Sequence, residues 1–205
     1  MALIRNTPIA PVESGTSPQD LLADLWHAAP ATRRRAARDL AGVPQASQAL
    51  AERLDEEQQP AVREAIITSL ASLADPLAVE TLLDCLRSDD AALRSDAGEA
   101  LKSAGQRHAG MIHQALHDSD PDVRILVLGI LESLRHPDLE SWLIDLLEQD
   151  PHVNVCAGAV DLLCEFGSGR AISALEACLA RFPDEPYLRF GVELAMRRLN
   201  AENGQ

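Results

Sequence analysis

Two histidines spaced four residues apart are the first residues in this sequence whose types could support chemistry. His113 and His117 lie in a segment with helical periodicity, and this spacing can bring two imidazoles to one metal ion. His113, however, falls at a repeat position that is otherwise apolar, whereas His117 falls at a surface position. Because no carboxylate or cysteine is fixed opposite the two rings, the pair is only a weak candidate for a metal site. We expect no metal and no cofactor.

Asp161 and Asn154 are polar residues at positions where the surrounding pattern predicts other types. Asp161 falls in a column of core leucines, and Asn154 falls in a column of arginines. A buried carboxylate without a partner is unfavourable or takes up a proton, so two interpretations remain open. In the first, helix rotation lets Val160, Leu162 and Leu163 fill the core while Asp161 reaches solvent. In the second, Asp161, together with Asn154, is a polar anchor for a ligand.

The sequence contains no catalytic motif. Its four cysteines, Cys85, Cys156, Cys164 and Cys178, lack CxxC spacing, which argues against a zinc site and against a secreted disulfide framework. No Gly-rich phosphate loop, pair of catalytic carboxylates or Ser-His-Asp arrangement fits the pattern. We therefore expect a binding protein without catalysis of its own.

The charge and composition of the chain limit its partners. The 205 residues carry a formal net charge of −14, and 46% of them are hydrophobic, although only 3% are aromatic. An acidic surface repels phosphate backbones, so we expect no nucleic-acid partner. No apolar run approaches the roughly 20 residues that a membrane helix needs, so we expect no membrane partner and a cytoplasmic location. The dominance of Ala and Leu favours closely packed helices.

Possible helix starts recur at a spacing near thirty residues. One series of starts lies near Pro30, Pro60, Ala91, Pro121, Pro151 and Pro186. A second, interleaved series lies near Pro44, Pro76, Gln106, Pro137 and Ser168. Proline suits the first turn of a helix, where no N–H is needed. Two interleaved series with the same period indicate paired helices, with a first and a second helix in each pair.

The second helices share an apolar residue followed by arginine, just inside a start that an acidic turn precedes. The arginine column contains Arg33, Arg63, Arg94, Arg124 and Arg189, with Asn154 in the fifth pair. This pattern resembles HEAT repeats, especially the short type of the phycobilin lyases. The resemblance implies an all-α, armadillo-like α-solenoid of about six antiparallel helix pairs, a HEAT-like superhelix. It also implies an arginine ladder with acids in the same or an adjacent turn, and Asp118 with Arg124 and Glu57 with Arg63 have that spacing.

The resemblance covers residues 17–199. We expect pairs near residues 17–42, 44–74, 76–104, 106–135, 137–166 and 168–199. Residues 1–16 contain Pro8, Pro11 and Gly15 and show no helical period, so we expect a flexible N-terminal arm. Residues 200–205 would form a short tail.

In a HEAT stack the second helices line the concave side, and this implication predicts an exposed surface. Its outward positions are mostly polar in the first three pairs and apolar or small in the last three. The predicted partner-binding residues are Ile125, Gly129, Glu132, Val155, Ala159, Leu162, Phe190 and Leu194. Exposed apolar patches usually mark a partner site, although the chain's own arm, tail or tilt could also cover this one.

These patterns predict a protein–protein interaction module, which means an adaptor, scaffold or chaperone-like protein. The concave face of the C-terminal half would take a helix or an extended segment of a partner protein, with acidic residues steering basic ones. The alternative is a lyase-like protein that handles a cofactor such as a tetrapyrrole in the concave groove. The chain offers no lyase-specific residues, and no histidine is followed by the glutamate that HEAT-type di-iron hydroxylases use.

Overall fold

The computed structural model describes residues 17–203, and within them the chain is helical with no strand. Six successive helix pairs are α1 (Pro18–Asp24) with α2 (Pro30–Asp39), α3 (Ser47–Glu56) with α4 (Pro60–Leu73), α5 (Pro76–Cys85) with α6 (Ala91–Ala104), α7 (Ala109–Ala115) with α8 (Pro121–Leu131), α9 (Leu139–Gln149) with α10 (Val153–Phe166), and α11 (Ile172–Arg181) with α12 (Pro186–Asn203). Short 3₁₀ turns, η1 (Leu40–Gly42), η2 (Gly105–His108) and η3 (Gly169–Ala171), follow α2 or precede α7 and α11.

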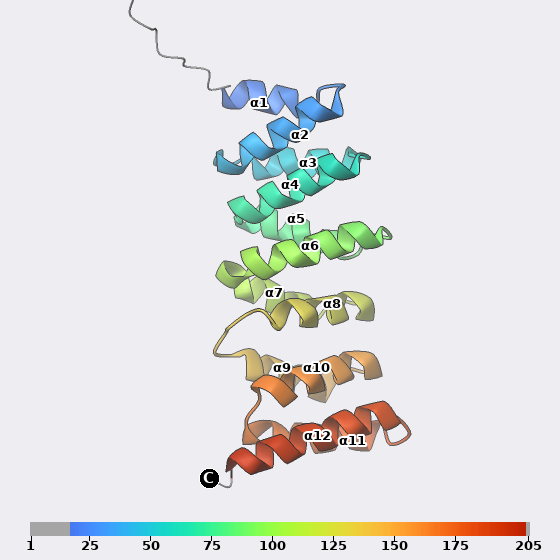
Figure 1. The fold of residues 1–205 in the computed structure, drawn as a ribbon. Helices are drawn as coiled ribbons and strands as arrows, with labels where there is room; N and C mark the ends of the chain where they lie inside the picture. The colour runs from blue at the N-terminus through green and yellow to red at the C-terminus, as the bar shows by residue number, and fades with distance from the viewer. Residues whose placement is uncertain (1–16, 204–205) are drawn as a thin grey trace, which may run out of the picture.

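The pairs stack in chain order along one axis (Figure 1). Each second helix packs against the second helices of the neighbouring pairs, and α2, α4, α6, α8, α10 and α12 together form one side of the stack, here called the second-helix face. The first helices lie behind them. This arrangement confirms the predicted all-α solenoid of about six antiparallel pairs.

Most helices begin where the sequence predicts a start. Proline occupies the first turn of α1, α2, α4, α5 and α8. The side chains of Asp75, Asp90 and Asp120 accept backbone N–H groups at the starts of α5, α6 and α8, and so satisfy donors that the helix itself cannot. The start of α10 differs, because this helix begins at Val153 and leaves Pro151 outside it.

The core between the pairs consists of Leu, Ile, Val and Ala side chains, most of them fully buried. Small residues allow close helix contact in the C-terminal half. A Cβ on Gly158 of α10 would lie 2.9 Å from Leu128 Cδ1 of α8, and one on Gly191 of α12 would lie 3.3 Å from Val160 Cγ1. None of the helices within residues 17–203 is long and apolar enough to cross a membrane.

The arginine ladder joins neighbouring pairs rather than residues of one pair. Arg33 binds Glu57 through two hydrogen bonds of 2.7 and 2.9 Å, and Arg124 binds Asp150 through two of 2.7 and 2.9 Å. Arg63 binds Asp90 at 2.8 Å. The expected pairing of Arg63 with Glu57 and of Arg124 with Asp118 was therefore wrong, because each guanidinium reaches across to the acid that precedes the next second helix.

The other ladder arginines bind backbone carbonyls. Arg94 donates to the Ser88 carbonyl at 2.6 Å, and Arg189 donates to that of Pro183. Arg124 makes the same type of bond to the Asp118 carbonyl, six residues earlier. The ladder arginine holds the turn before its own helix in the first, third, fourth and sixth pairs, and it bonds a carboxylate of the following pair in the first, second and fourth pairs.

The predicted N-terminal arm, residues 1–16, lies outside the described residues. At the other end α12 continues to Asn203, beyond the expected end of the solenoid at residue 199.

Candidate functional site

The predicted surface is present on α8. Gly129 and Glu132 are exposed, and Ile125 is partly buried against the core. On α12, Phe190 and Leu194 are 62% and 47% exposed. The structure therefore places these five predicted residues on the second-helix face.

The predicted surface is absent from α10. Val155 and Ala159 are fully buried and Leu162 is 7% exposed, so the first two do not face solvent at all. The reason is a register error of two residues. Pro151 resembles the prolines that open other second helices, but α10 begins at Val153, and its burial pattern matches that of α8 when Val153 is aligned with Pro121.

This register explains both polar residues that did not fit the pattern. Asp161 is exposed and corresponds to Gly129, while Val160 and Leu163 are buried. Of the two interpretations of Asp161, the structure thus favours the first for its position. Asn154 is also exposed. The residue at the ladder position is Cys156. Its thiol donates to the carbonyl of Asp150, six residues earlier, over 3.4 Å, and Arg124 likewise donates to the carbonyl of Asp118, six residues before it.

A signal in the sequence could have revealed the correct register. Glu57 and Asp118 lie three residues before the starts of α4 and α8, and Asp150 lies three residues before Val153. In α10 the acid, rather than the proline, lies at the spacing that precedes α4 and α8.

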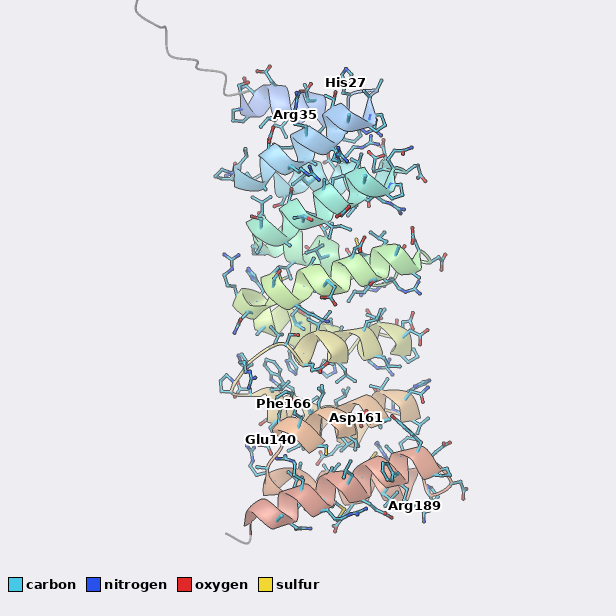
Figure 2. All side chains as sticks on the ribbon, viewed as in Figure 1. His27, Arg35, Glu140, Asp161, Phe166 and Arg189 are labelled. Atoms are coloured by element: carbon cyan, nitrogen blue, oxygen red, sulfur yellow. The ribbon has the colours of Figure 1, made fainter. Side chains whose placement is uncertain are left out.

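Adjacent second helices enclose a shallow hollow of about 340 Å³ between α8 and α10, here called the C-terminal hollow. Its lining residues are Ile125, Leu128, Gly129, Glu132, Gly158, Asp161, Leu162 and Glu165. Figure 2 labels Asp161 on α10, on the side of the stack that the second helices form. The hollow thus has an apolar floor and three carboxylates on its rim.

A second hollow of about 300 Å³ lies between α4 and α6 and is here called the N-terminal hollow. Its lining residues are Glu64, Ile67, Thr68, Ala71, Asp96, Glu99, Ala100 and Ser103. Counted from the helix starts, these are the same eight repeat positions that line the C-terminal hollow. This hollow was not identified from the sequence, because the outward positions of the first three pairs are mostly polar.

The rim carboxylates have few partners. Within residues 17–203, the side chains of Glu132, Asp161 and Glu165 make no hydrogen bond or ion pair. Partial burial raises the pKa of the Asp161 carboxyl above its usual range. Within residues 17–203, the three carboxylates on this rim therefore lack a cationic partner.

The C-terminal helix adds a stripe of exposed large side chains. Tyr187 is 71% exposed, and it precedes Phe190 and Leu194 by three and seven residues, a spacing that places all three along one side of α12. Tyr187 was not among the predicted residues.

The histidines form an aromatic cluster. The ring of His113 stacks on Trp142 with centroids 4.5 Å apart and meets His117 edge-on at 5.6 Å, and His136 stacks on Trp142 at 4.4 Å. Burial, followed by the charges of His117 and His136, lowers the pKa of His113. Within residues 17–203 no group of three His, Cys, Asp or Glu side chains could hold a metal ion.

Two of the four free cysteines lie together under Arg181. Cys156 and Cys178 are fully buried, and Arg181 donates to the Cys156 sulfur at 3.5 Å and to the carbonyls of Leu147 and Glu148. Hydrogen bonds from Cys156 and Arg181 outweigh burial and lower the pKa of the Cys178 thiol to about 7. The hydrogen bond to Cys178, together with burial, raises the pKa of the Cys156 thiol.

Solved structures of similar shape come from several kinds of protein. Human deoxyhypusine hydroxylase in complex with glycerol aligns over 90% of this chain and 84% of its own, with 17% identity and a TM-score of 0.46. The complex of CpcE and CpcF of phycocyanin lyase from Nostoc sp. PCC7120 aligns over 95% and 100%, with 18% identity and a TM-score of 0.42. An engineered protein aligns over 90% and 96%, with 20% identity and a TM-score of 0.42.

A search of the curated proteins found no match. A sequence model of the family of HEAT repeats, by contrast, matches residues 18–102 and 110–197, which is most of the chain. Together with the stacked helix pairs and the arginine ladder, this match shows that the protein belongs to the HEAT-repeat family.

Proposed function

We propose that the protein binds a segment of a partner protein on the C-terminal half of its second-helix face, as a cytoplasmic adaptor, scaffold or chaperone-like module. The observation that carries this proposal is the exposure of Phe190 and Leu194 on α12, on the same face as the C-terminal hollow between α8 and α10. Large exposed apolar side chains beside a hollow are typical of a protein interface, where aromatic residues contribute much of the binding energy.

The chemistry of the hollow favours a polypeptide over a tetrapyrrole. The volume of about 340 Å³ lies at the lower end of the roughly 300–1,000 Å³ of small-molecule sites. Its rim carries Glu132, Asp161 and Glu165, which would repel the propionate carboxylates of a tetrapyrrole. A peptide can place an apolar side chain on the floor without bringing negative charge.

A displayed peptide library selected on the full chain tests this proposal. Peptides from the selection are expected to lose at least tenfold in affinity for Phe190→Asp and for Ile125→Asp, because both changes place a charge on the proposed surface. The matched control is Ala180→Asp, an exposed position on α11. Thermal melting of each variant separates lost binding from lost folding. Peptides that bind folded Phe190→Asp and Ile125→Asp as tightly as the unchanged protein would refute the proposal.

A further inference from the structure

We infer that the partner segment is extended and cationic, with Lys or Arg between aliphatic anchors about six residues apart, and that it crosses the second helices from α4 to α10. This inference rests on the proposed function and adds the N-terminal hollow to the binding surface. It is argued from the paired hollows and from their six rim carboxylates, five of which have no partner within residues 17–203.

The two hollows repeat one design. Each has an aliphatic floor, with Ile67 and Ala100 in the N-terminal hollow and Leu128 and Leu162 in the C-terminal one. Each also has three carboxylates on its rim. These are Glu64, Asp96 and Glu99 in the N-terminal hollow and Glu132, Asp161 and Glu165 in the C-terminal hollow. Both floors therefore suit an aliphatic side chain and both rims suit a cation, although only Glu99 and Asp161 share a repeat position.

The rim carboxylates differ from the carboxylates that stabilise the fold. Glu57, Asp90, Asp118 and Asp150 each bind an arginine. Among the six rim carboxylates in residues 17–203, only Glu99 has a cationic partner, Lys102, which lies on the same helix. The rim is a line of negative charge with a single lysine, and cations from another molecule complement it.

The spacing of the hollows favours an extended segment. Neighbouring packed helices lie about 8–10 Å apart, so hollows two helices apart are separated by roughly 16–20 Å. An extended chain covers that distance in about six residues, at about 3.3 Å per residue. Two separate hollows suit two separate side-chain anchors, whereas the face of a partner helix would need a continuous groove.

The chain's own ends do not supply this ligand. Residues 1–16 contain one arginine, Arg5, and one glutamate, Glu13, and residues 204–205 are Gly and Gln. Their charges cannot complement six carboxylates, which favours a partner protein as the source of the segment.

Fluorescence anisotropy with a designed peptide tests the inference on the full chain. The probe is a labelled 13-residue peptide with leucines six positions apart and with lysines and serines elsewhere. In its matched partner every lysine is glutamine. We expect the lysine peptide to bind at least tenfold more tightly than the glutamine peptide at 50 mM NaCl, and to weaken severalfold at 300 mM because salt screens the pairs.

Two rim variants locate the binding site. Glu132→Gln with Asp161→Asn and Glu165→Gln should weaken the lysine peptide at least tenfold, and Glu64→Gln with Asp96→Asn and Glu99→Gln at least threefold. The control, Glu56→Gln with Glu148→Gln and Glu176→Gln, removes the same charge from exposed positions on the first helices α3, α9 and α11 and should change affinity less than twofold.

The outcomes separate this inference from the proposed function. Equal weakening by the control and rim variants would mean a general charge effect and overturn the inference, as would loss in only one hollow. Library-selected peptides that are neutral but still need Phe190 and Ile125 would overturn the cationic segment and leave the proposed function standing. Loss of that dependence on Phe190 and Ile125 would refute the proposed function itself.

Discussion

Helices α8 and α10 share one burial pattern but differ at the ladder position. In α8 that position holds Arg124, which bonds Asp150 of the next pair, whereas in α10 it holds Cys156, to whose sulfur Arg181 of α11 donates. The same packing can thus be reached with the ladder arginine or without it. The difference teaches that the ladder joins pairs, while the apolar pattern decides which face of each helix is buried.

Removing the ladder arginine of α8 should cause the largest loss of stability among the changes considered. Arg124→Ala should destabilise the protein by about 3–5 kcal/mol, because it leaves Asp150 buried without its cation. Arg94→Ala is the matched control, since Arg94 bonds only a backbone carbonyl, and it should cost about 1 kcal/mol. Urea denaturation measures both. Equal losses would mean that the carboxylate pair adds nothing beyond the carbonyl bond.

The helix pairs and the surfaces of α8 and α12 could be predicted from the sequence, because prolines, caps and apolar periodicity are local signals. The surface of α10 was placed two residues out of register, since Pro151 resembles a helix start, although Asp150 lies at the spacing that precedes α4 and α8. The partners of Arg33 and Arg63 lie in the next pair, so finding them requires the stacking geometry. For the same reason no local pattern indicates that Arg181 reaches Cys156 and the carbonyls of Leu147 and Glu148.

Acid should also break a ladder ion pair, that of Arg33 with Glu57 near the N-terminal end of the stack. Although burial opposes it, hydrogen bonds from Arg33 and from the Gln59 N–H, with the charge of Arg53, lower the pKa of Glu57 from 4.5 to about 2. The ionised form is favoured in the folded state, so this stabilisation is complete above about pH 4.5 and is lost as the pH falls towards 2. It amounts to about 3 kcal/mol.

Urea denaturation of Glu57→Gln between pH 2 and 6 measures this contribution. The variant should be less stable than the unchanged protein at pH 6 and should lose less stability on acidification. Glu176→Gln, at an exposed position, should follow the unchanged protein throughout. Parallel pH profiles for all three proteins would contradict the prediction.

Gly129 of α8 and Gly158 of α10 differ in how closely a neighbouring side chain packs against them. Alanine at Gly158 of α10 places a Cβ 2.9 Å from Leu128 Cδ1, so Leu128 must shift, and the cost of this shift offsets the gain in helix propensity. Alanine at Gly129 of α8 meets nothing within 4 Å and should gain about 0.5–1 kcal/mol through better helix propensity. Thermal melting should show a clear gain for Gly129→Ala and a smaller gain or a loss for Gly158→Ala, and equal gains would disprove the close packing.

The smallest expected effect belongs to Asp161, the residue at the position of Gly129. Because its carboxylate is exposed and without a partner, Asp161→Asn should change stability by no more than about 0.5 kcal/mol at pH 7. Burial raises the pKa of the Asp161 carboxyl. Any small gain in stability from Asp161→Asn should therefore be present at pH 7, where this carboxyl is ionised, and vanish in acid, where it is protonated. Binding of the cationic peptide should weaken. Native melting with native binding would remove Asp161 as an anchor.

Each ladder ion pair joins one helix pair to the next, so the junctions between neighbouring helix pairs differ in the interactions that they contain. In a nearest-neighbour description each junction carries its own interface energy. The junction after the first pair contains the buried carboxylate of Glu57, whereas Arg181 and Arg198 hold the last pair to the fifth through backbone carbonyls, beside the ion pair of Arg170 with Glu140. Because the pKa of Glu57 is lowered to about 2 in the folded state, strong acid weakens the first junction, while the bonds to backbone carbonyls at the last junction do not titrate. The first pair should therefore undock in acid before the last one.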